Sequence, residues 1–346
     1  YWGVWYLKCA DTIMVTGVTG QDGSLAASLC LSLGLNVVGV GRKKIEDANL
    51  SVFDSNIRYF HSDYSVRSLE ALLDELKPAV ILNFAGQSYA TKSWALLEET
   101  TFSQITLPGN FLTAIEKVKP DCYFLNACSS EILGGLSSGL PASTDQKLLT
   151  PYAVAQRAGF EMVKVFRDVK NHRASNAIFY NHESILRPSE FVFKKVISSA
   201  SRCAKRQANS IALGNLDAVR DWGYAPEYII IALIIALRGI TADLPICSGV
   251  GISVFDMADC AFGYYDLNVN DFLRVDPDLC RKNEIPKIVG DTGPLIRLLG
   301  TAPKYGGENL IEKICDDYER RARGESWIDW NALIAETGLT FEALVQ

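Results

Sequence analysis

Residues 12–23, with the sequence TIMVTGVTGQDG, decide the fold class of this chain. The first five residues are mostly apolar or β-branched, which predicts a buried strand, and a helical pattern runs from residue 23 to residue 33. Between them the glycines are spaced G-x-x-G-x-x-G. A glycine turn between a strand and a helix lets a pyrophosphate approach the backbone and meet the N–H groups of the helix N-terminus. We therefore predict a dinucleotide site here, with contacts from Gly17, Thr19, Gly20, Gln21, Asp22 and Gly23.

Short apolar runs alternate with longer amphipathic stretches through the first half of the chain. The alternation is typical of an α/β protein with a doubly wound parallel sheet, whose strands are buried on both faces. From residue 181 onward, short strands, helices and many prolines indicate a smaller mixed α/β substrate lobe, some of whose segments return to the sheet. We expect a Rossmann domain over 11–180 and the lobe over 181–346. The predicted strands are 12–16, 36–40, 57–60, 79–83, 122–126 and 175–180, and the predicted helices include 23–33, 68–76 and 107–118.

Composition excludes several classes of protein. The 346 residues carry a formal net charge of −6, so a general binder of nucleic acid or of anionic membranes is not expected. The nine cysteines are scattered and contain no C-x-x-C pair, which argues against a zinc site and a disulfide framework, and we expect no metal. We interpret them as buried residues of a cytoplasmic protein. The apolar run 228–237 is too short to cross a bilayer and predicts a buried helix.

The end of the second predicted strand bears on the choice of cofactor. A site for NAD commonly places an acidic residue there, whereas this chain has Arg42 and Lys43, whose charges suit the 2′-phosphate of NADP. The alternative is that they are solvated surface charges. Asp63, after the third strand, is placed to meet the adenine amine, although an ordinary helix N-cap would explain it nearly as well.

Polar residues follow the predicted strand 122–126, at the edge where open α/β sheets bind ligands. Ser129, Ser130 and Glu131 come first, and Tyr152 follows Pro151 further along the chain. A hydroxyl, a carboxylate and a phenol beside a nicotinamide would form a hydride-transfer site with an acid/base pair. Each residue alone also has a structural explanation, as a helix cap, a solvated charge or a core residue.

Several segments together resemble the extended short-chain dehydrogenase/reductase family and, within it, the GDP-mannose 4,6-dehydratase family. The matching segments are 16–24, 83–88, 129–131, 151–155, 181–184, 213–218 and 220–223, and the resemblance runs from about residue 12 to about residue 320. It implies a redox cycle on a nucleotide-linked hexose. A hydride leaves sugar carbon 4, water is lost across carbons 5 and 6, and the hydride returns to carbon 6.

The resemblance also implies roles for individual residues. Tyr152 is the phenolic base, Glu131 is the acid/base at carbons 5 and 6, and Ser129 bonds the sugar oxygen. His182 receives no task and is interpreted as structural. Cofactor contacts are expected from Ala85, Gln87, Tyr152 and Gln156, and contacts to the nucleotide-sugar from Ser88, Ser130, Asn181, Glu183, Lys195, Arg220 and Arg281. A homodimer or homotetramer is expected.

The sequence departs from the family pattern at Gln156, where the family has a lysine four residues after the tyrosine. An ammonium there would lower the pKa of the phenol, and glutamine brings no charge. Phe255 and Val219 also replace basic residues of the family, and 185–187 keeps only Arg187 of an expected pair. Three hypotheses stay open: a nucleotide-sugar dehydratase, an epimerase or keto-sugar reductase on the same scaffold, and a binder of NADP and nucleotide-sugar without catalysis.

Overall fold

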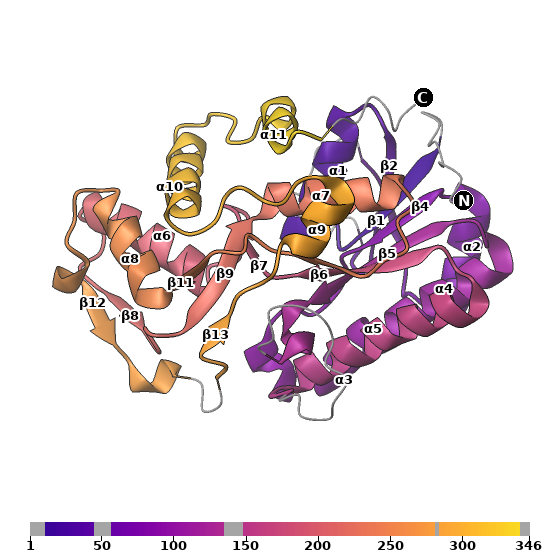
Figure 1. Ribbon diagram of the computed structural model, residues 1–346, viewed down its shortest axis with the longest axis horizontal. Helices are drawn as coiled ribbons and strands as arrows, with labels where there is room; N and C mark the ends of the chain where they lie inside the picture. Colours follow the sequence, from indigo (N-terminus) through magenta and orange to yellow (C-terminus); the bar gives the residue numbers. More distant parts are fainter. Residues whose placement is uncertain (1–10, 45–56, 135–147, 281–283, 340–346) are drawn as a thin grey trace.

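The computed structural model describes residues 11–44, 57–134, 148–280 and 284–339. A seven-stranded sheet, in the order β10-β6-β5-β4-β1-β2-β3, is parallel throughout and forms the larger body (Figure 1). Its strands are β1 (Thr12–Thr16), β2 (Asn36–Gly41), β3 (Arg58–His61), β4 (Val80–Asn83), β5 (Tyr123–Ser129), β6 (Ala174–Phe179) and β10 (Leu244–Ile246). The predicted parallel sheet is confirmed, with strand boundaries shifted by at most three residues.

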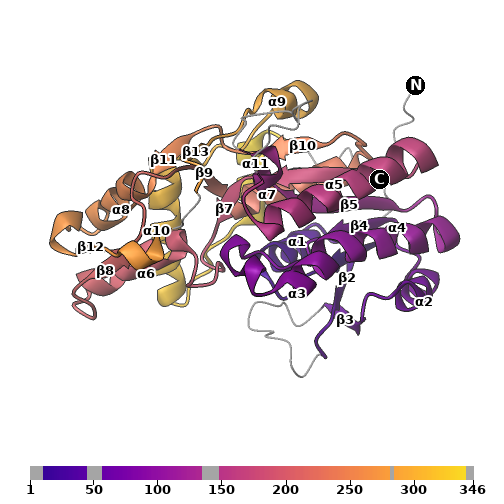
Figure 2. The same cartoon turned by 90° about the horizontal axis from the view of Figure 1, so that it is seen from below.

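Helices cover both faces of this sheet (Figure 2). One face packs on α1 (Gln21–Ser32) and α7 (Ala225–Leu237), and α11 (Trp330–Thr337) lies against α7. The other face packs on α2 (Val66–Leu76), α4 (Leu107–Val118) and α5 (Pro151–Lys170). Every residue of α7 is buried, including Glu227, and the apolar run 228–237 predicts this burial for most of the helix. The seven-stranded sheet therefore lies between two helical layers.

The lobe is built around β9 (Val219–Tyr224). This strand pairs with β7 (Asn181–Glu183), β11 (Gly251–Ser253) and β13 (Lys287–Ile288), while β8 (Ile211–Leu213) pairs separately with β12 (Leu273–Val275). Helices α6 (Val192–Ala204), α8 (Val254–Gly263) and α10 (Glu308–Ala322) pack together beside these strands (Figure 1). Between α8 and β13 lie the short turns η6 (Val269–Asp271) and η7 (Pro277–Leu279), and α9 (Gly293–Leu299) follows.

A break in helical geometry precedes α4. Residues Leu97–Thr101 form α3, the next five residues, Phe102–Thr106, form the π-helical turn η4, and α4 follows directly. Such turns are frequent at functional sites. The periodicity of the sequence did not predict this one. Two further short helical turns, η3 (Ala90–Trp94) and η5 (Ser130–Leu133), follow the carboxyl ends of β4 and β5.

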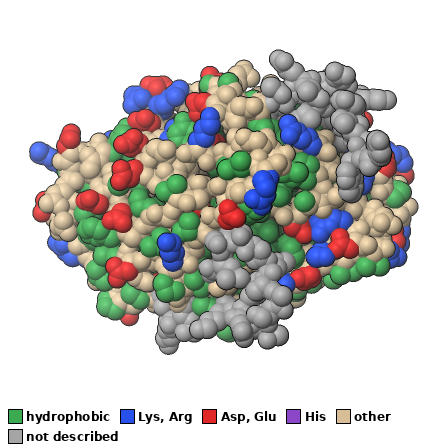
Figure 3. Space-filling view, in the orientation of Figure 1, with side chains coloured by type: hydrophobic (Ala, Val, Ile, Leu, Met, Phe, Trp, Pro, Cys, Tyr) green, Lys and Arg blue, Asp and Glu red, His purple; other side chains and the backbone are tan. Residues whose placement is uncertain are grey.

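Charges of both signs are interspersed on the face drawn in Figure 3, and the coloured side chains form no broad basic patch there. Within the described ranges, no helix is long and apolar enough to cross a membrane. The same residues contain no disulfide and no cluster of side chains that could hold a metal ion.

Candidate active site

A cleft of about 590 Å³ opens between the carboxyl edge of the seven-stranded sheet and the lobe. The sheet contributes the residues that follow β4 and β5, together with the first turns of α5. The lobe contributes β7, the start of α6 and residues around β8 and β9. Cleft-lining residues named by the sequence are Asp22, Ala85, Gln87, Ser88, Ser129, Ser130, Glu131, Tyr152, Gln156, Asn181, Glu183, Lys195 and Arg220.

The glycine turn between β1 and α1 leaves no room for a side chain at Gly17 or at Gly23. Gly17 has φ +65°, and a Cβ atom there would lie 2.6 Å from the Phe84 carbonyl oxygen. A Cβ at Gly23 would lie 2.4 Å from the Gly17 carbonyl oxygen, which already accepts a 2.9 Å bond from the Gly20 N–H. Gly20 is the N-cap of α1 and provides no capping side chain. Backbone N–H groups are thus presented at a bare helix N-terminus, as an anion site requires.

Two residues of this turn also hold the lobe. The Gln21 amide donates 3.1 Å to the His182 carbonyl and accepts 2.8 Å from the Ser184 hydroxyl, so contact to a cofactor falls to its backbone. Asp22 Oδ1 lies 3.0 Å from His182 Nε2. Burial raises the Asp22 pKa, but the charge and hydrogen bond of His182 outweigh it and bring the pKa to about 2. The other imidazole nitrogen faces the Tyr180 carbonyl at 2.7 Å. Burial lowers the His182 pKa, but the charge and hydrogen bond of Asp22 outweigh it, so the pKa lies above its usual value. His182 thus links α1 to β7.

The three expected catalytic side chains meet at one end of the cleft. Ser129 ends β5, and its hydroxyl accepts the Glu131 backbone N–H at 3.2 Å. The Glu131 carboxylate accepts a 3.3 Å bond from Thr150, which is also the N-cap of α5. Tyr152, in the first turn of α5, is buried. Ser129 and Glu131 lie on one segment and Tyr152 on another, and the fold brings both segments to a common wall.

Gln156 is built into this wall. Its amide oxygen accepts the Ser129 backbone N–H at 3.1 Å, and its amide nitrogen donates to Tyr152 Oη at 3.2 Å and to Gln104 Oε1 at 2.8 Å. The Ser129 N–H can only donate, so it fixes which end of the amide faces which partner. The Tyr152 oxygen therefore accepts a bond from a neutral amide.

Gln104 is a site residue that the sequence analysis missed. It lies in the π-helical turn η4 and donates 2.8 Å to the Gln87 carbonyl oxygen while it receives the Gln156 amide. A Cβ at Gly159 of α5 would lie 2.0 Å from the Gln104 carbonyl oxygen, so the two segments pack at backbone distance. Nothing in the local residue pattern marks Gln104, because its role depends on the extra residue of the π turn.

The environment of Tyr152 raises the pKa of its phenol well above the usual value. Burial is the largest cause and the negative charge of Glu131 the next, while a hydrogen bond with Ser129 acts in the opposite direction. The amide of Gln156 adds no positive charge. Tyr152 is therefore protonated at neutral pH.

The expected cofactor-selecting residues follow the carboxyl ends of β2 and β3, and none of them lines the cleft. Arg42 follows β2, is exposed, and forms a 2.7 Å ion pair with Glu99. Lys43 is exposed as well, and its carbonyl accepts a bond from Tyr59. Asp63 accepts the Ser65 N–H at 2.9 Å, which holds its pKa below the usual value. Ser65 is the N-cap of α2, so the N-cap explanation of Asp63 is wrong and its carboxylate forms a turn before the helix.

In the lobe wall, the cations expected to contact the nucleotide-sugar are bonded to acceptors of the protein. Arg220 lies 3.0 Å from Glu284, and Lys195 donates 2.6 Å to the Ala212 carbonyl oxygen. Arg187 lies 3.5 Å from the buried carboxylate of Glu183. Burial raises the Glu183 pKa, with Arg187 opposing it. Asn181 and the exposed Ser88 line the cleft as expected, and Arg281 lies outside the described residues.

Comparison with known proteins adds the family. The model of the GDP-mannose 4,6 dehydratase family matches residues 14–314. GDP-mannose 4,6 dehydratase 1 of Arabidopsis thaliana is 28% identical over 336 residues, which are 92% of this chain and 92% of that protein.

Solved structures show the same fold. The dTDP-glucose 4,6-dehydratase of Bacillus anthracis in complex with NAD aligns with TM-score 0.75 at 14% identity, over 91% of this chain and 99% of that chain. RMD from Pseudomonas aeruginosa complexed with NADPH aligns with TM-score 0.71 at 19% identity, over 90% of this chain and all of the other. With the family model spanning most of its length, the chain belongs to the GDP-mannose 4,6-dehydratase family.

Proposed function

We propose that the protein is a nucleotide-sugar 4,6-dehydratase that uses NADP and acts on GDP-mannose or a related nucleotide-hexose. The observation that carries the proposal is the meeting of Ser129, Glu131 and Tyr152 in the cleft that Asp22, next to the glycine turn, also lines. The cleft volume of about 590 Å³ falls in the range of small-molecule and cofactor sites.

The residues present fit a nicotinamide dinucleotide. Gly17 and Gly23 leave a cradle that a Cβ would fill, and the Gln87 Oε1 atom is buried in the cleft wall with no partner among the described residues. The backbone of 17–23 would hold the pyrophosphate, and Ala85, Gln87, Tyr152 and Gln156 would line the rest. When bound, the nicotinamide would serve as the hydride acceptor and then as the hydride donor.

The acid and base roles that the family resemblance implies are compatible with the geometry. Tyr152 would take the proton of the carbon 4 hydroxyl, with Ser129 beside it to bond the same oxygen. Glu131, which Thr150 orients, would take the proton from carbon 5 once carbon 4 is a ketone, and would protonate the departing hydroxyl of carbon 6. The two groups interact electrostatically, so the charge on Glu131 opposes ionisation of Tyr152.

Hydrogen exchange at sugar carbon 5 tests this assignment. In heavy water, the protein with NADP and GDP-mannose should place deuterium at carbon 5 of the substrate or at carbon 5 of the 4-keto-6-deoxy product. Glu131→Gln should lower that rate by at least about a hundredfold, the scale of a lost general base, while NADP binding is unchanged. Exchange that proceeds equally fast in Glu131→Gln would contradict the role of Glu131.

The preference for NADP over NAD rests on Arg42. Its position after β2 suits a 2′-phosphate, and its ion pair with Glu99 keeps the guanidinium at the sheet edge. We expect Arg42→Leu to weaken NADPH binding about tenfold and to leave NADH binding nearly unchanged, measured by titration of the protein with each dinucleotide. Lys170→Leu, which removes an exposed cation on α5, is the matched control. Equal losses for both dinucleotides would show that Arg42 does not select the cofactor.

A second activity, reduction of a keto sugar, is favoured by Gln156. Tyr152 accepts a bond from the Gln156 amide and is protonated, so its proton is available to a ketone oxygen. A ketone that enters already formed requires no phenolate. Product analysis with NADPH and a 4-keto-6-deoxy nucleotide-sugar distinguishes the two activities, because only the reductase forms a new alcohol.

We further propose that residues 11–180 form the cofactor domain and residues 181–346 mainly the nucleotide-sugar lobe. Asn181, Glu183, Lys195 and Arg220 would serve the nucleotide-sugar, since they line the lobe side of the cleft. A homodimer or homotetramer in the cytoplasm is also proposed. The exposed apolar residues Val154, Val165 and Val169 on α5 support self-association.

A further inference from the structure

A row of polar side chains crosses the otherwise apolar interior of the seven-stranded sheet. Thr16, Asn83, Asn126 and Asn176 are paired in register on the neighbouring strands β1, β4, β5 and β6. Their exposed fractions are 0%, 3%, 5% and 1%. Polar groups buried this deeply are costly unless each is hydrogen-bonded, so their placement calls for an explanation.

The row is a continuous hydrogen-bond chain. The Thr16 hydroxyl donates to Asn83 at 2.7 Å, and the Asn83 amide donates to Asn126 at 2.9 Å. The Asn126 amide donates to Asn176 at 3.1 Å, and the Asn176 amide donates to Asp243 at 3.0 Å. Every donor therefore points from the glycine turn toward Asp243.

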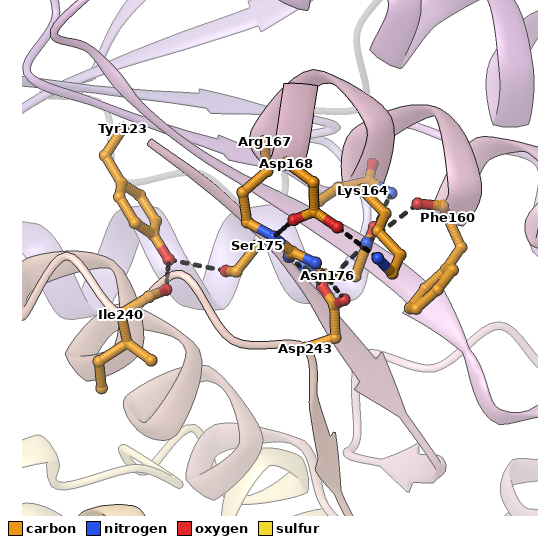
Figure 4. A network of polar contacts seen from close by, with 10 residues as sticks. Tyr123, Phe160, Lys164, Arg167, Asp168, Ser175, Asn176, Ile240 and Asp243 are labelled. Atoms are coloured by element: carbon orange, nitrogen blue, oxygen red, sulfur yellow. Dashed lines mark hydrogen bonds and ion pairs between the residues drawn. The ribbon is translucent and has the colours of Figure 1, made fainter. Parts of the chain in front are cut away.

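Asp243 is the last acceptor of this hydrogen-bond chain. It lies just before β10 and does not line the cleft. Figure 4 shows its carboxylate between Asn176 and Arg167 of α5. Arg167 donates two bonds of 2.7 Å to the two carboxylate oxygens, and the Asn176 backbone N–H donates a further bond of 2.9 Å. Both ionic side chains are largely buried, with exposed fractions of 13% and 14%. A bidentate pair of this kind is geometrically well defined.

At its other end the chain reaches the dinucleotide site. The Thr16 oxygen accepts the backbone N–H groups of Phe84 and Ala85 at 3.1 and 3.0 Å. The Phe84–Ala85 peptide packs against the glycine turn, because a Cβ on Gly17 would lie within 2.8 Å of its carbonyl and amide atoms. Phe84 and Ala85 also line the cleft.

The two ends determine the direction of every bond between them. Two backbone N–H groups occupy the Thr16 oxygen as an acceptor, so its proton must go to Asn83. A carboxylate only accepts, so Asp243 holds the Asn176 amide with its nitrogen outward. No amide in the row can turn over without breaking a bond on each side. The Asn176 amide nitrogen also donates 3.2 Å to the Phe160 carbonyl oxygen, so loss of Asp243 removes one of its two side-chain acceptors and the charged one.

We propose that Asp243, held by Arg167, is a positioning residue for the dinucleotide site and acts through this chain on the Phe84–Ala85 peptide. The inference rests on the proposed use of a nicotinamide dinucleotide. Asp243 does not line the cleft, and the four buried side chains are the hydrogen-bonded route from its carboxylate to the Phe84–Ala85 peptide. A second route runs through Arg167 and α5, so hydrogen exchange at Phe84 and Ala85 is the measurement that distinguishes the two.

The test compares Asp243→Ala and Asp243→Asn with the control Asp317→Ala. Asp317 is another buried carboxylate held by a hydroxyl and a lysine, but it lies on α10 in the lobe. We expect Asp243→Ala to raise the Kd for NADPH about 3- to 30-fold, the range of coupling through packed networks. It should also speed hydrogen exchange of the Phe84 and Ala85 amides without ligand. Asp243→Asn keeps an acceptor for Asn176, so its Kd for NADPH and its hydrogen exchange at Phe84 and Ala85 should stay close to the wild-type values.

The outcomes are distinct. If Asp243→Ala loses thermal stability as Asp317→Ala does but keeps wild-type NADPH affinity and wild-type exchange at Phe84 and Ala85, the proposal is overturned. If the wild type binds neither NADPH nor NADH, the proposed function is wrong, and the inference that rests on it fails for that reason. If Asp243→Ala does not fold, Arg167→Met is used instead, because it keeps the Asp243 carboxylate and removes the guanidinium that holds it. Arg167→Met must then raise the Kd for NADPH and speed exchange at Phe84 and Ala85, each by less than is expected for Asp243→Ala.

Discussion

Gln156 decides how the phenol of Tyr152 can act. The family resemblance implies a lysine at this position, and glutamine in its place predicts a weaker base. The structure adds that the glutamine oxygen accepts the Ser129 N–H, a bond that a lysine side chain cannot accept. The amide also bonds Gln104, which holds it in place. Gln156 therefore does more than omit the positive charge of a lysine, because it also forms part of the hydrogen-bonded wall of the cleft.

This residue yields a pH prediction. A tyrosine acts as a base only when deprotonated, so activity should rise with pH through the Tyr152 pKa, which burial and Glu131 raise. Gln156→Lys places an ammonium near the phenol and should lower its pKa by about two units. The rising limb of the kcat/KM profile with GDP-mannose should therefore move to lower pH.

Gln156→Met is the control for that substitution, because it removes the amide bonds and adds no charge. Its rising limb should not move to lower pH. If Gln156→Lys leaves the limb in place, or if Gln156→Met shifts it downward as well, the charge is not what controls Tyr152.

At the level of elements, local patterns predicted the sheet well. The strand over Thr12–Thr16 and the helix over Leu107–Val118 match the structure exactly, because their apolar runs and turn residues leave little choice. The π turn with Gln104 and the row of buried asparagines were not predicted. Both depend on contacts between strands and helices far apart in the sequence, where a glutamine or asparagine has no distinctive local pattern.

The glycine turn offers a matched pair of substitutions. Gly17 and Gly34 both have positive φ, +65° and +70°, so alanine costs each about 1 kcal/mol of backbone strain. At Gly17 the new Cβ also meets the Phe84 carbonyl at 2.6 Å, whereas at Gly34 it meets nothing within 4 Å. Gly17→Ala should abolish measurable NADPH binding, and Gly34→Ala should lower thermal stability but bind normally. Equal affinity in both variants would contradict a phosphate site at this turn.

At the level of the whole molecule, the fold brings the sheet edge and the lobe together around one cleft. Glu131 and Tyr152 come from the sheet side, and Asn181 and Arg220 from the lobe side. The Gln21 and Asp22 contacts to residues 182–184 tie the two sides at the glycine turn. Composition alone excludes other classes of protein but does not reveal this arrangement.

The most direct measurement follows a deuterium label from carbon 4 of the hexose. GDP-mannose labelled there is incubated with the protein and NADP, and the product is analysed by NMR. A 4,6-dehydratase should deliver the label to carbon 6 of a 4-keto-6-deoxy product, with NADP unchanged in amount at the end. Label that stays on carbon 4, or that accumulates in reduced dinucleotide, would contradict the account.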